Sequence, residues 1–152
     1  MMKEKGTFFI PTLAAGYHII KHGAKSGIPE YAIKKELEIS KKSIESFKRA
    51  YEAGVKIAMG TDTGTPFNHH GDNAKELELM VKNGMSPMEA IIATTRVASE
   101  AIGLNDKIGT LEKEKLADLL VIDGDPLRDI TVLQNKKLIK VVMKEGEKFN
   151  NK

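Results

Sequence analysis

Two short apolar segments, separated by one long charged segment, limit the folds open to this chain. Residues 7–13 read Thr-Phe-Phe-Ile-Pro-Thr-Leu, and residues 55–62 read Val-Lys-Ile-Ala-Met-Gly-Thr-Asp. Both are typical of strands that are buried on both faces, as in a parallel sheet. Between them, residues 29–53 are rich in helix formers, and their apolar residues mostly share one helical face before Gly54 ends the helix. This order predicts an α/β fold with parallel strands.

The second half of the chain predicts further helices and then a change to strands. A helix is expected over residues 72–83. Ser86, Pro87 and Glu89 predict the start of another, because Ser can cap a helix, Pro fits its first turn and Glu completes a capping box. That helix should run to about Ala101. Strand-like segments separated by turn residues follow at 108–111, 117–123 and 138–144, before a polar tail at 150–152.

This order of elements does not close a sheet. Two parallel strands leave an unpaired edge on each side, and stable proteins cover or pair such edges. We therefore expect the chain to associate, either with copies of itself as a homo-oligomer or with a separate chain that supplies the missing strands.

The composition argues against several classes of function. The 24 Lys and Arg residues are interspersed with 21 Asp and Glu residues and form no basic stripe, so no nucleic-acid partner is expected. There is no cysteine, so any metal must be held by His, Asp or Glu, and a reducing compartment is favoured. No apolar run approaches the ~18 residues of a membrane span, and residues 1–6 lack the apolar region of a secretory signal. We expect a soluble, cytoplasmic protein with no membrane partner.

Asp62 is the first candidate for a functional residue. It ends the second apolar segment within the small, polar sequence Gly-Thr-Asp-Thr-Gly at 60–64. Chemistry in α/β enzymes gathers where buried strands end, which allows a role in catalysis or metal binding. The same five residues also suit a turn or helix-capping aspartate, and the residues alone favour this second interpretation while leaving the first open.

The four histidines form two pairs in the sequence, and each pair has both a functional and a non-functional interpretation. His18 and His22 are four residues apart, a spacing that allows a shared metal if the segment is helical. The alternative is an ordinary exposed helix face. His69 and His70 are adjacent, so they point in different directions in an extended loop, and solvated loop histidines are the alternative there.

Three motifs in a fixed order identify a family that this chain resembles. The first is Gly-Thr-Asp-Thr-Gly at 60–64, after an apolar strand. The second is Ser-Pro-Met-Glu-Ala-Ile at 86–91 with Ala-Thr-Thr at 93–95, and the third is Gly-Thr-Leu at 109–111 before Lys-Leu-Ala-Asp-Leu-Leu-Val at 115–121. Together they resemble the amidohydrolase superfamily, in its imidazolonepropionase-like and Xaa-Pro dipeptidase-like branch. The resemblance covers nearly the whole chain.

The resemblance implies the C-terminal part of a TIM-barrel metal-dependent hydrolase. Residues 1–104 would be the last two βα units of the barrel, and residues 105–152 would be strands of the small composite β-sandwich and the polar tail. The chain would then begin in the middle of a larger sequence, after six barrel strands. A complementing N-terminal chain is thus a second possible partner beside a homo-oligomer.

The resemblance also implies roles for particular residues. Asp62 matches the final metal-site aspartate of the family, so it would be both a catalytic residue and a metal ligand. His70 and Asn73 match the loop that lines the substrate pocket, and Tyr17 and His18 would lie near the barrel mouth and touch a small-molecule substrate. The family's His-x-His pair, carboxylated Lys or Glu, and two later His ligands have no match here. Zinc or another divalent metal is therefore expected in the complete enzyme, whereas this chain alone could hold none.

Two residues depart from the family pattern, and both concern a local turn. Arg96 stands where Asn is commoner, and Glu114 stands where a turn Gly is usual. The predicted function is that of a C-terminal piece of an amidohydrolase that cleaves a C–N bond in a cyclic amide or dipeptide-like substrate, inactive alone. One alternative is a non-catalytic half-barrel module that assembles with itself or a partner chain. Another is a small-molecule binding protein built on Asp62, His70 and Asn73.

Overall fold

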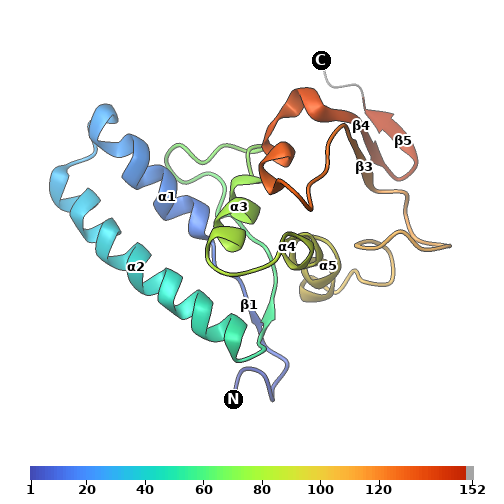
Figure 1. Cartoon of the computed structure of the whole chain (residues 1–152), viewed down its shortest axis with the longest axis horizontal. Coiled ribbons are helices and arrows are strands. Elements are labelled where there is room, and N and C mark those ends of the chain that lie inside the picture. Colours follow the sequence, from blue (N-terminus) through green and yellow to red (C-terminus); the bar gives the residue numbers. More distant parts are fainter. Residues whose placement is uncertain (150–152) are drawn as a thin grey trace.

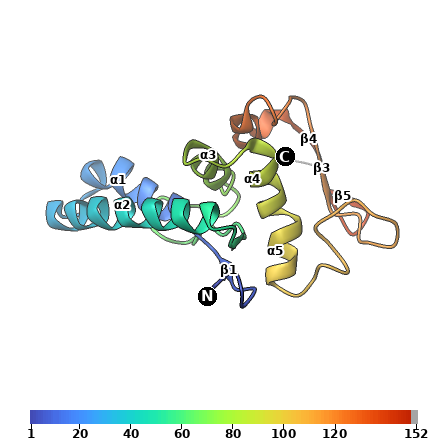
Figure 2. The same ribbon diagram turned by 60° about the horizontal axis from the view of Figure 1, so that its bottom comes forward.

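The computed structural model describes residues 1–149, which form a mixed α/β chain (Figure 1). A pair of helices, α1 (Leu13–His22) and α2 (Glu30–Glu52), lies at one end of the molecule, and a short 3-10 helix, η1 (Gly23–Ser26), joins them. A three-stranded sheet lies at the other end. Short helices and one pair of parallel strands occupy the centre (Figures 1 and 2).

The predicted parallel strands are present but short. Strand β1 (Phe8–Phe9) pairs in parallel with β2 (Lys56–Ile57), and α1 and α2 form the crossover between them. The predicted strand over residues 7–13 is wrong in its second half. Pro11 has no N–H to donate to a ladder, and Thr12 has a left-handed backbone (φ 48°), so the chain leaves the strand before α1 begins.

The observed helices agree with the predicted ones except in two respects. The helix predicted over residues 29–53 is confirmed as α2, whereas α3 is shorter than predicted and covers Lys75–Lys82. The capping box at Ser86 is confirmed, since its hydroxyl accepts the Glu89 N–H and the Glu89 carboxylate accepts the Ser86 N–H at 2.9 Å. The helix that follows, however, divides into two, α4 (Pro87–Thr94) and α5 (Arg96–Ala101).

Two threonines at the junction account for this division. The hydroxyls of Thr94 and Thr95 donate to the carbonyls of Ala90 and Ile91, each at 2.8 Å. Hydrogen bonds of this kind compete with the helix ladder and bend it. Thr95 has non-helical torsions, φ −110° and ψ −84°, and Figure 2 shows α5 following α4 across that point.

The C-terminal sheet is antiparallel, in the order β3 (Leu119–Ile122), β4 (Ile139–Lys144), β5 (Glu147–Phe149). Two 3-10 helices, η2 (Ile130–Gln134) and η3 (Lys136–Leu138), lie between β3 and β4. The strands predicted over 117–123 and 138–144 are thus confirmed as β3 and β4. Strand β5 was not predicted, and the positive φ angles of Glu145 and Gly146 match the two-residue turn that joins it to β4.

The predicted strand at 108–111 is wrong, because Gly109 adopts φ +96° and the segment is irregular. A Cβ on Gly109 would also meet the carbonyl oxygen of Thr95 at 3.0 Å, so this loop is shaped by its fit against α5. The predicted polar tail at 150–152 lies outside the described residues.

The core lies where α1, α2, α3 and α4 meet the parallel strands. Phe47 and Met80 are its largest fully buried apolar side chains, packed with Leu13, Ile57, Leu77, Met85, Ala90, Ala93 and Ile130. Edge strand β3 is different, because its Leu120 and Val121 side chains are about half exposed. Across residues 1–149, the helices are all too short or too polar to cross a membrane.

We expect Phe47→Ala to lower the free energy of unfolding by about 3–5 kcal/mol, because Phe47 is fully buried and its loss leaves a cavity. Phe149→Ala is the matched control, since that ring is 51% exposed and its removal should change stability by about 0.5 kcal/mol or less. Urea denaturation of the three proteins measures both effects. Equal losses in the two variants would contradict this placement of the core.

Candidate functional site

Asp62 lies on the loop that follows the carboxyl end of parallel strand β2, outside any helix or hairpin turn. Its backbone is left-handed (φ 53°), a conformation that Asp tolerates better than most residues. Its carbonyl accepts the Thr65 hydroxyl at 2.9 Å. Its carboxylate is exposed and makes no hydrogen bond or ion pair with residues 1–149, so it is free to act on another group.

The two glycines beside Asp62 serve different purposes. Gly64 has φ +105°, which allows the chain to leave the strand sharply. Gly60, which the sequence would equally suggest for such an exit, has no positive φ. A Cβ on Gly60 would lie 2.6 Å from Cγ2 of Ile10, so this glycine instead permits the close approach of the segment after β1.

Asn68 fixes the backbone of the Asp62 loop. Its side chain is 1% exposed, and its Nδ2 donates to the carbonyls of Thr61 at 2.6 Å and Asp62 at 3.3 Å. The backbone carbonyl of Asn68 accepts the N–H of Gly64 at 2.9 Å. Sequence reasoning missed Asn68, because nothing in the local pattern distinguishes it from the other polar loop residues.

Helix α1 begins without a cap of its own, and a distant carboxylate replaces it. Thr12 occupies the N-cap position but its side chain makes no capping hydrogen bond, and the first turn of α1 has no acidic residue. Instead, the N–H groups of Leu13 and Ala14 donate to Oε1 and Oε2 of Glu76 at 2.8 and 2.7 Å. Glu76 is fully buried near the start of α3, so it joins the exits of the two parallel strands.

Helix α3 carries a second carboxylate, Glu78, whose pKa is shifted in the opposite direction from that of Glu76. Burial raises the pKa of Glu76 to about 7, against the two N–H donors, which act to lower it. Burial also acts to raise the pKa of Glu78, but Lys75 and Lys82 at 2.5 Å and Gln134 at 2.7 Å outweigh it and hold that pKa at about 2.

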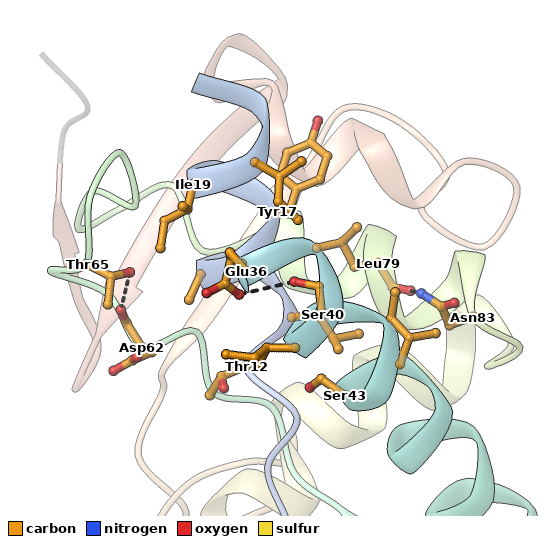
Figure 3. A pocket seen from close by; sticks show the side chains of 16 residues that line it. Thr12, Tyr17, Ile19, Glu36, Ser40, Ser43, Asp62, Thr65, Leu79 and Asn83 are labelled. Carbon is orange, nitrogen blue, oxygen red and sulfur yellow. Dashed lines mark hydrogen bonds between the residues drawn. The ribbon is translucent and has the colours of Figure 1, made fainter. Parts of the chain in front are cut away.

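A cavity of about 370 Å³ lies between α1, α2 and the Asp62 loop (Figure 3). Asp62 and Tyr17 are among its lining residues, with Thr12 at the start of α1 and the hydrogen-bonded pair Glu36 and Ser40 on α2. The structure thus brings Asp62 and Tyr17, two of the predicted site residues, to the same cavity.

A larger groove, of about 1240 Å³, lies between α1, α4, α5 and the C-terminal sheet. Tyr17, His18 and Asn73 line it together, so these three predicted residues share one space. His70 lines neither the groove nor the cavity and is exposed on the loop between β2 and α3. Much of the remaining lining is apolar and comes from β3, β4 and the helices.

Cations surround Tyr17 within this groove. The Nζ atoms of Lys75 and Lys21 lie 4.7 and 5.3 Å from the centre of its ring. The Lys21 ammonium lowers the pKa of Tyr17 against the effect of burial, and Lys75 adds to the lowering. The groove therefore combines apolar walls with the ammonium groups of Lys21 and Lys75, of which the second is paired with Glu78.

His18 carries two buried ring nitrogens that have no hydrogen-bond partner in residues 1–149. Burial lowers its pKa, and the neighbouring His22 and Lys75 lower it further, which favours the neutral ring. The His18 residue is therefore half-buried, with its ring nitrogens turned away from solvent. Its ring stacks on that of His22, which lies 5.7 Å from Phe67, so a row of rings connects α1 to the Asp62 loop.

Comparison with known proteins identifies the family. A carboxylate at the carboxyl end of parallel strands, beside a cavity, is the arrangement found in α/β enzymes. The model of the amidohydrolase family matches residues 1–148, so the chain belongs to the amidohydrolase family, whose members are hydrolases. This confirms the family predicted from the three motifs.

Several relatives are similar to nearly the whole chain. Ochratoxinase from Aspergillus niger is 32% identical over 151 residues, which are 98% of this chain and 30% of that protein. A crystal structure of a Xaa-Pro dipeptidase with bound methionine has a TM-score of 0.86 and 38% identity, and the match covers 99% of this chain and 36% of that one. Imidazolonepropionase from Thermoplasma volcanium is 33% identical over 96 residues, 62% of this chain and 24% of that protein. The chain thus spans about a third of the length of these relatives or less.

We expect the two α3 carboxylates to give opposite dependences of stability on pH. The folded-state pKa of Glu76 is raised, so its contribution is present below pH 4.5 and is lost as pH rises through about 7, by about 3 kcal/mol. The folded-state pKa of Glu78 is lowered, so its contribution is present above pH 4.5 and is lost as pH falls towards 2.

Urea denaturation at intervals between pH 3 and pH 8 separates the contributions of Glu76 and Glu78 to the free energy of unfolding. Glu76→Gln should remove the loss of stability between about pH 5 and 8, and Glu78→Gln should remove only part of the acid loss. A Glu76→Gln variant that keeps the wild-type decline towards pH 8 would contradict the assignment.

Proposed function

We propose that this chain supplies the last two βα units of a TIM-barrel metal-dependent amidohydrolase, with residues 105–152 belonging to its β-sandwich. The reaction is hydrolysis of a C–N bond in a cyclic amide or dipeptide-like substrate. The free carboxylate of Asp62, at the exit of a parallel strand in an amidohydrolase-family chain, is the observation that carries the proposal. The names of two relatives, a Xaa-Pro dipeptidase and an imidazolonepropionase, support the substrate class.

The residues of this chain fit one part of a metal site. The Asp62 carboxylate is an exposed oxygen donor without a competing partner among residues 1–149, and oxygen is a suitable ligand for zinc and other divalent metals. The same residues contain no group of three or more His, Cys, Asp or Glu side chains arranged to hold a metal. A catalytic zinc takes about three protein ligands, so the remaining ligands must come from outside these residues. A metal bound there lowers the pKa of a water to roughly 7 and polarises the substrate carbonyl.

Asp62 then acts as the proton carrier of the reaction. Its carboxylate accepts a proton from the attacking water and passes it to the nitrogen of the leaving amine, which breaks the C–N bond. The hydrogen bonds from Asn68 hold the Asp62 backbone, so the carboxylate keeps its direction during the transfer. A left-handed residue fixed in this way is a common feature of active sites.

Tyr17, His18 and Asn73 are the proposed substrate contacts. All three line the larger groove, and the neutral His18 ring, whose nitrogens are buried without a partner in the described residues, would offer one donor and one acceptor on turning towards a substrate. The Lys21 ammonium beside Tyr17, which pairs with no carboxylate in the described residues, suits a negatively charged group on the substrate. His70 is exposed on the Asp62–Asn73 loop and would meet a substrate from the rim.

A non-catalytic half-barrel module is the second candidate, because this chain leaves apolar strand surface uncovered. Leu120 and Val121 of edge strand β3 are 54% and 47% exposed, and β1 pairs only with β2 in the described residues. Such a surface suits assembly with copies of the chain or with a complementing N-terminal chain. The two candidates differ in whether Asp62 is needed for turnover when a complete barrel is present.

A chimera tests the role of Asp62. The segment of the Xaa-Pro dipeptidase that matches this chain is replaced by residues 1–148, and hydrolysis of an Xaa-Pro dipeptide is followed with added Zn²⁺. We expect Asp62→Asn to lower kcat by about 10²–10⁴-fold, as the loss of an acid–base group does. Asp106→Asn, at an exposed position outside both cavities, is the control and should leave kcat unchanged.

The chain alone should give no turnover with dipeptides or lactams, because it has one recognisable ligand. Turnover by the chain alone that is lost on chelation and in Asp62→Ala would show that the missing strands are not needed. A chimera that hydrolyses its substrate equally well with and without the Asp62→Asn substitution would favour the non-catalytic module.

We expect the purified chain to self-associate, or to remain soluble as one copy only with a complementing chain. Uncovered apolar strands are association surfaces, and Leu120→Lys on the edge strand should reduce association while leaving the helical core intact. Sedimentation velocity at micromolar concentration measures this. A monodisperse, folded wild-type monomer would mean that the chain covers its own strands.

A further inference from the structure

Glu76 makes an unusual connection between the two strand exits. It provides both capping oxygens for α1, although it lies 62 residues from Ala14 along the chain, and it is fully buried. Helix α1 begins shortly after β1, and α3 begins after the loop that leaves β2. The carboxylate of Glu76 therefore ties together the two segments that emerge from the carboxyl ends of the parallel pair.

The segments tied in this way form part of one wall around Asp62. Thr12 and Leu13, at the start of α1, line the same 370 Å³ cavity as Asp62. Thr12 is held at φ 48°, which a β-branched residue adopts only when its surroundings force it. The hydrogen bonds of Leu13 and Ala14 to Glu76 supply that constraint, because they fix the backbone immediately after Thr12.

From these contacts we infer that Glu76 is a positioning residue for Asp62, and that gain or loss of one proton on Glu76 changes the backbone around the Asp62 cavity. The inference rests on the proposed function only in giving Asp62 a catalytic role. Glu76 itself is enclosed by protein and acts through the start of α1.

A proton on Glu76 has a defined structural effect. As a carboxylate, Glu76 accepts one N–H on each oxygen. A carboxylic acid carries its proton on one of those oxygens, and a hydroxyl oxygen is a weaker acceptor than a carboxylate oxygen. The hydrogen bond from the Leu13 or the Ala14 N–H to that oxygen is then weakened, and the start of α1 shifts or loosens.

Burial and the two N–H donors set the pKa of Glu76, because no charged side chain pairs with it in the described residues. The titratable side chains on the helices packed against α3 are Tyr17, His18, Lys21 and His22 on α1 and Glu89 on α4, and η2 has none. In the described part of the chain none of these forms a hydrogen bond or ion pair with Glu76. On α3 itself, Lys75 and Lys82 pair with Glu78. Burial raises the pKa of Glu76 to about 7, so both protonation states are populated near neutral pH.

Nuclear magnetic resonance of the chain tests the inference without any enzymatic assay. The ¹³Cδ shift of Glu76 and the amide shifts of Leu13, Ala14, Asp62 and Thr63 are followed from about pH 3 to pH 9. We expect all five signals to share one midpoint, near pH 7. In Glu76→Gln the pH dependence at Leu13, Ala14, Asp62 and Thr63 should disappear, whereas Glu78→Gln should keep it.

The possible results are distinct. If the Asp62 and Thr63 amides stay flat, or follow another midpoint while Glu76 titrates near 7, then Glu76 is a structural cap only and the inference is wrong. A Glu76 midpoint near its ordinary value of 4.5 would also overturn it. If Glu76→Gln does not fold, the shared or separate midpoints of the wild-type chain still decide. Failure of the chimera to hydrolyse its substrate would count against the proposed function and leave this result unaffected.

Discussion

The rest of the structure depends on the cap that Glu76 provides for helix α1. The parallel pair is only two residues long on each strand, so its few hydrogen bonds fix the position of the following segments weakly. The two bonds from Leu13 and Ala14 to a buried carboxylate are charge-assisted when Glu76 is ionised, and they join α1 directly to α3. Phe47 and Met80 belong, with Leu13 of this junction, to the buried apolar cluster. A polar contact thus sets the geometry that the apolar core then supports.

In the Asp62 loop the backbone carbonyls accept hydrogen bonds, while the Asp62 carboxylate makes none with residues 1–149. The loop carbonyls of Thr61 and Asp62 are occupied by the buried Asn68 side chain, so the backbone is held from inside. The Asp62 carboxylate points to solvent with no partner among residues 1–149. A turn or capping aspartate, the alternative left open by the residues alone, would use its carboxylate on nearby N–H groups. In this loop an amide holds the backbone instead, which leaves the carboxylate for a substrate or metal.

Sequence reasoning predicted the features that depend on neighbouring residues. Helix α2 follows from its amphipathic pattern, the start of α4 follows from the Ser86 and Glu89 capping box, and the family follows from three ordered motifs. The cap that Glu76 provides for α1 could not be predicted. Its partners are backbone N–H groups 62 and 63 residues away, and nearly every residue has such a group, so the sequence does not mark them. The break at Thr95 and the buried role of Asn68 were missed for a different reason: their contacts are local, but a threonine or a loop asparagine is compatible with several backbone arrangements. Asp62 was identified by motif, while the sharing of one groove by Tyr17, His18 and Asn73 needed the fold.

The unpaired nitrogens of His18 have a consequence for molecular discrimination. Each buried polar atom without a partner destabilises the chain by about 1–3 kcal/mol. Both nitrogens are buried, so a molecule in the groove reaches them only when the ring turns towards it, and a molecule that then presents both an acceptor and a donor removes this penalty. An analogue of the same shape that lacks those polar atoms leaves both nitrogens without a hydrogen-bond partner. Sites of this kind reject such analogues far more strongly than an apolar pocket rejects a missing methylene. Under the proposed function, His18 would therefore select molecules by the polar atoms they carry and not by their size.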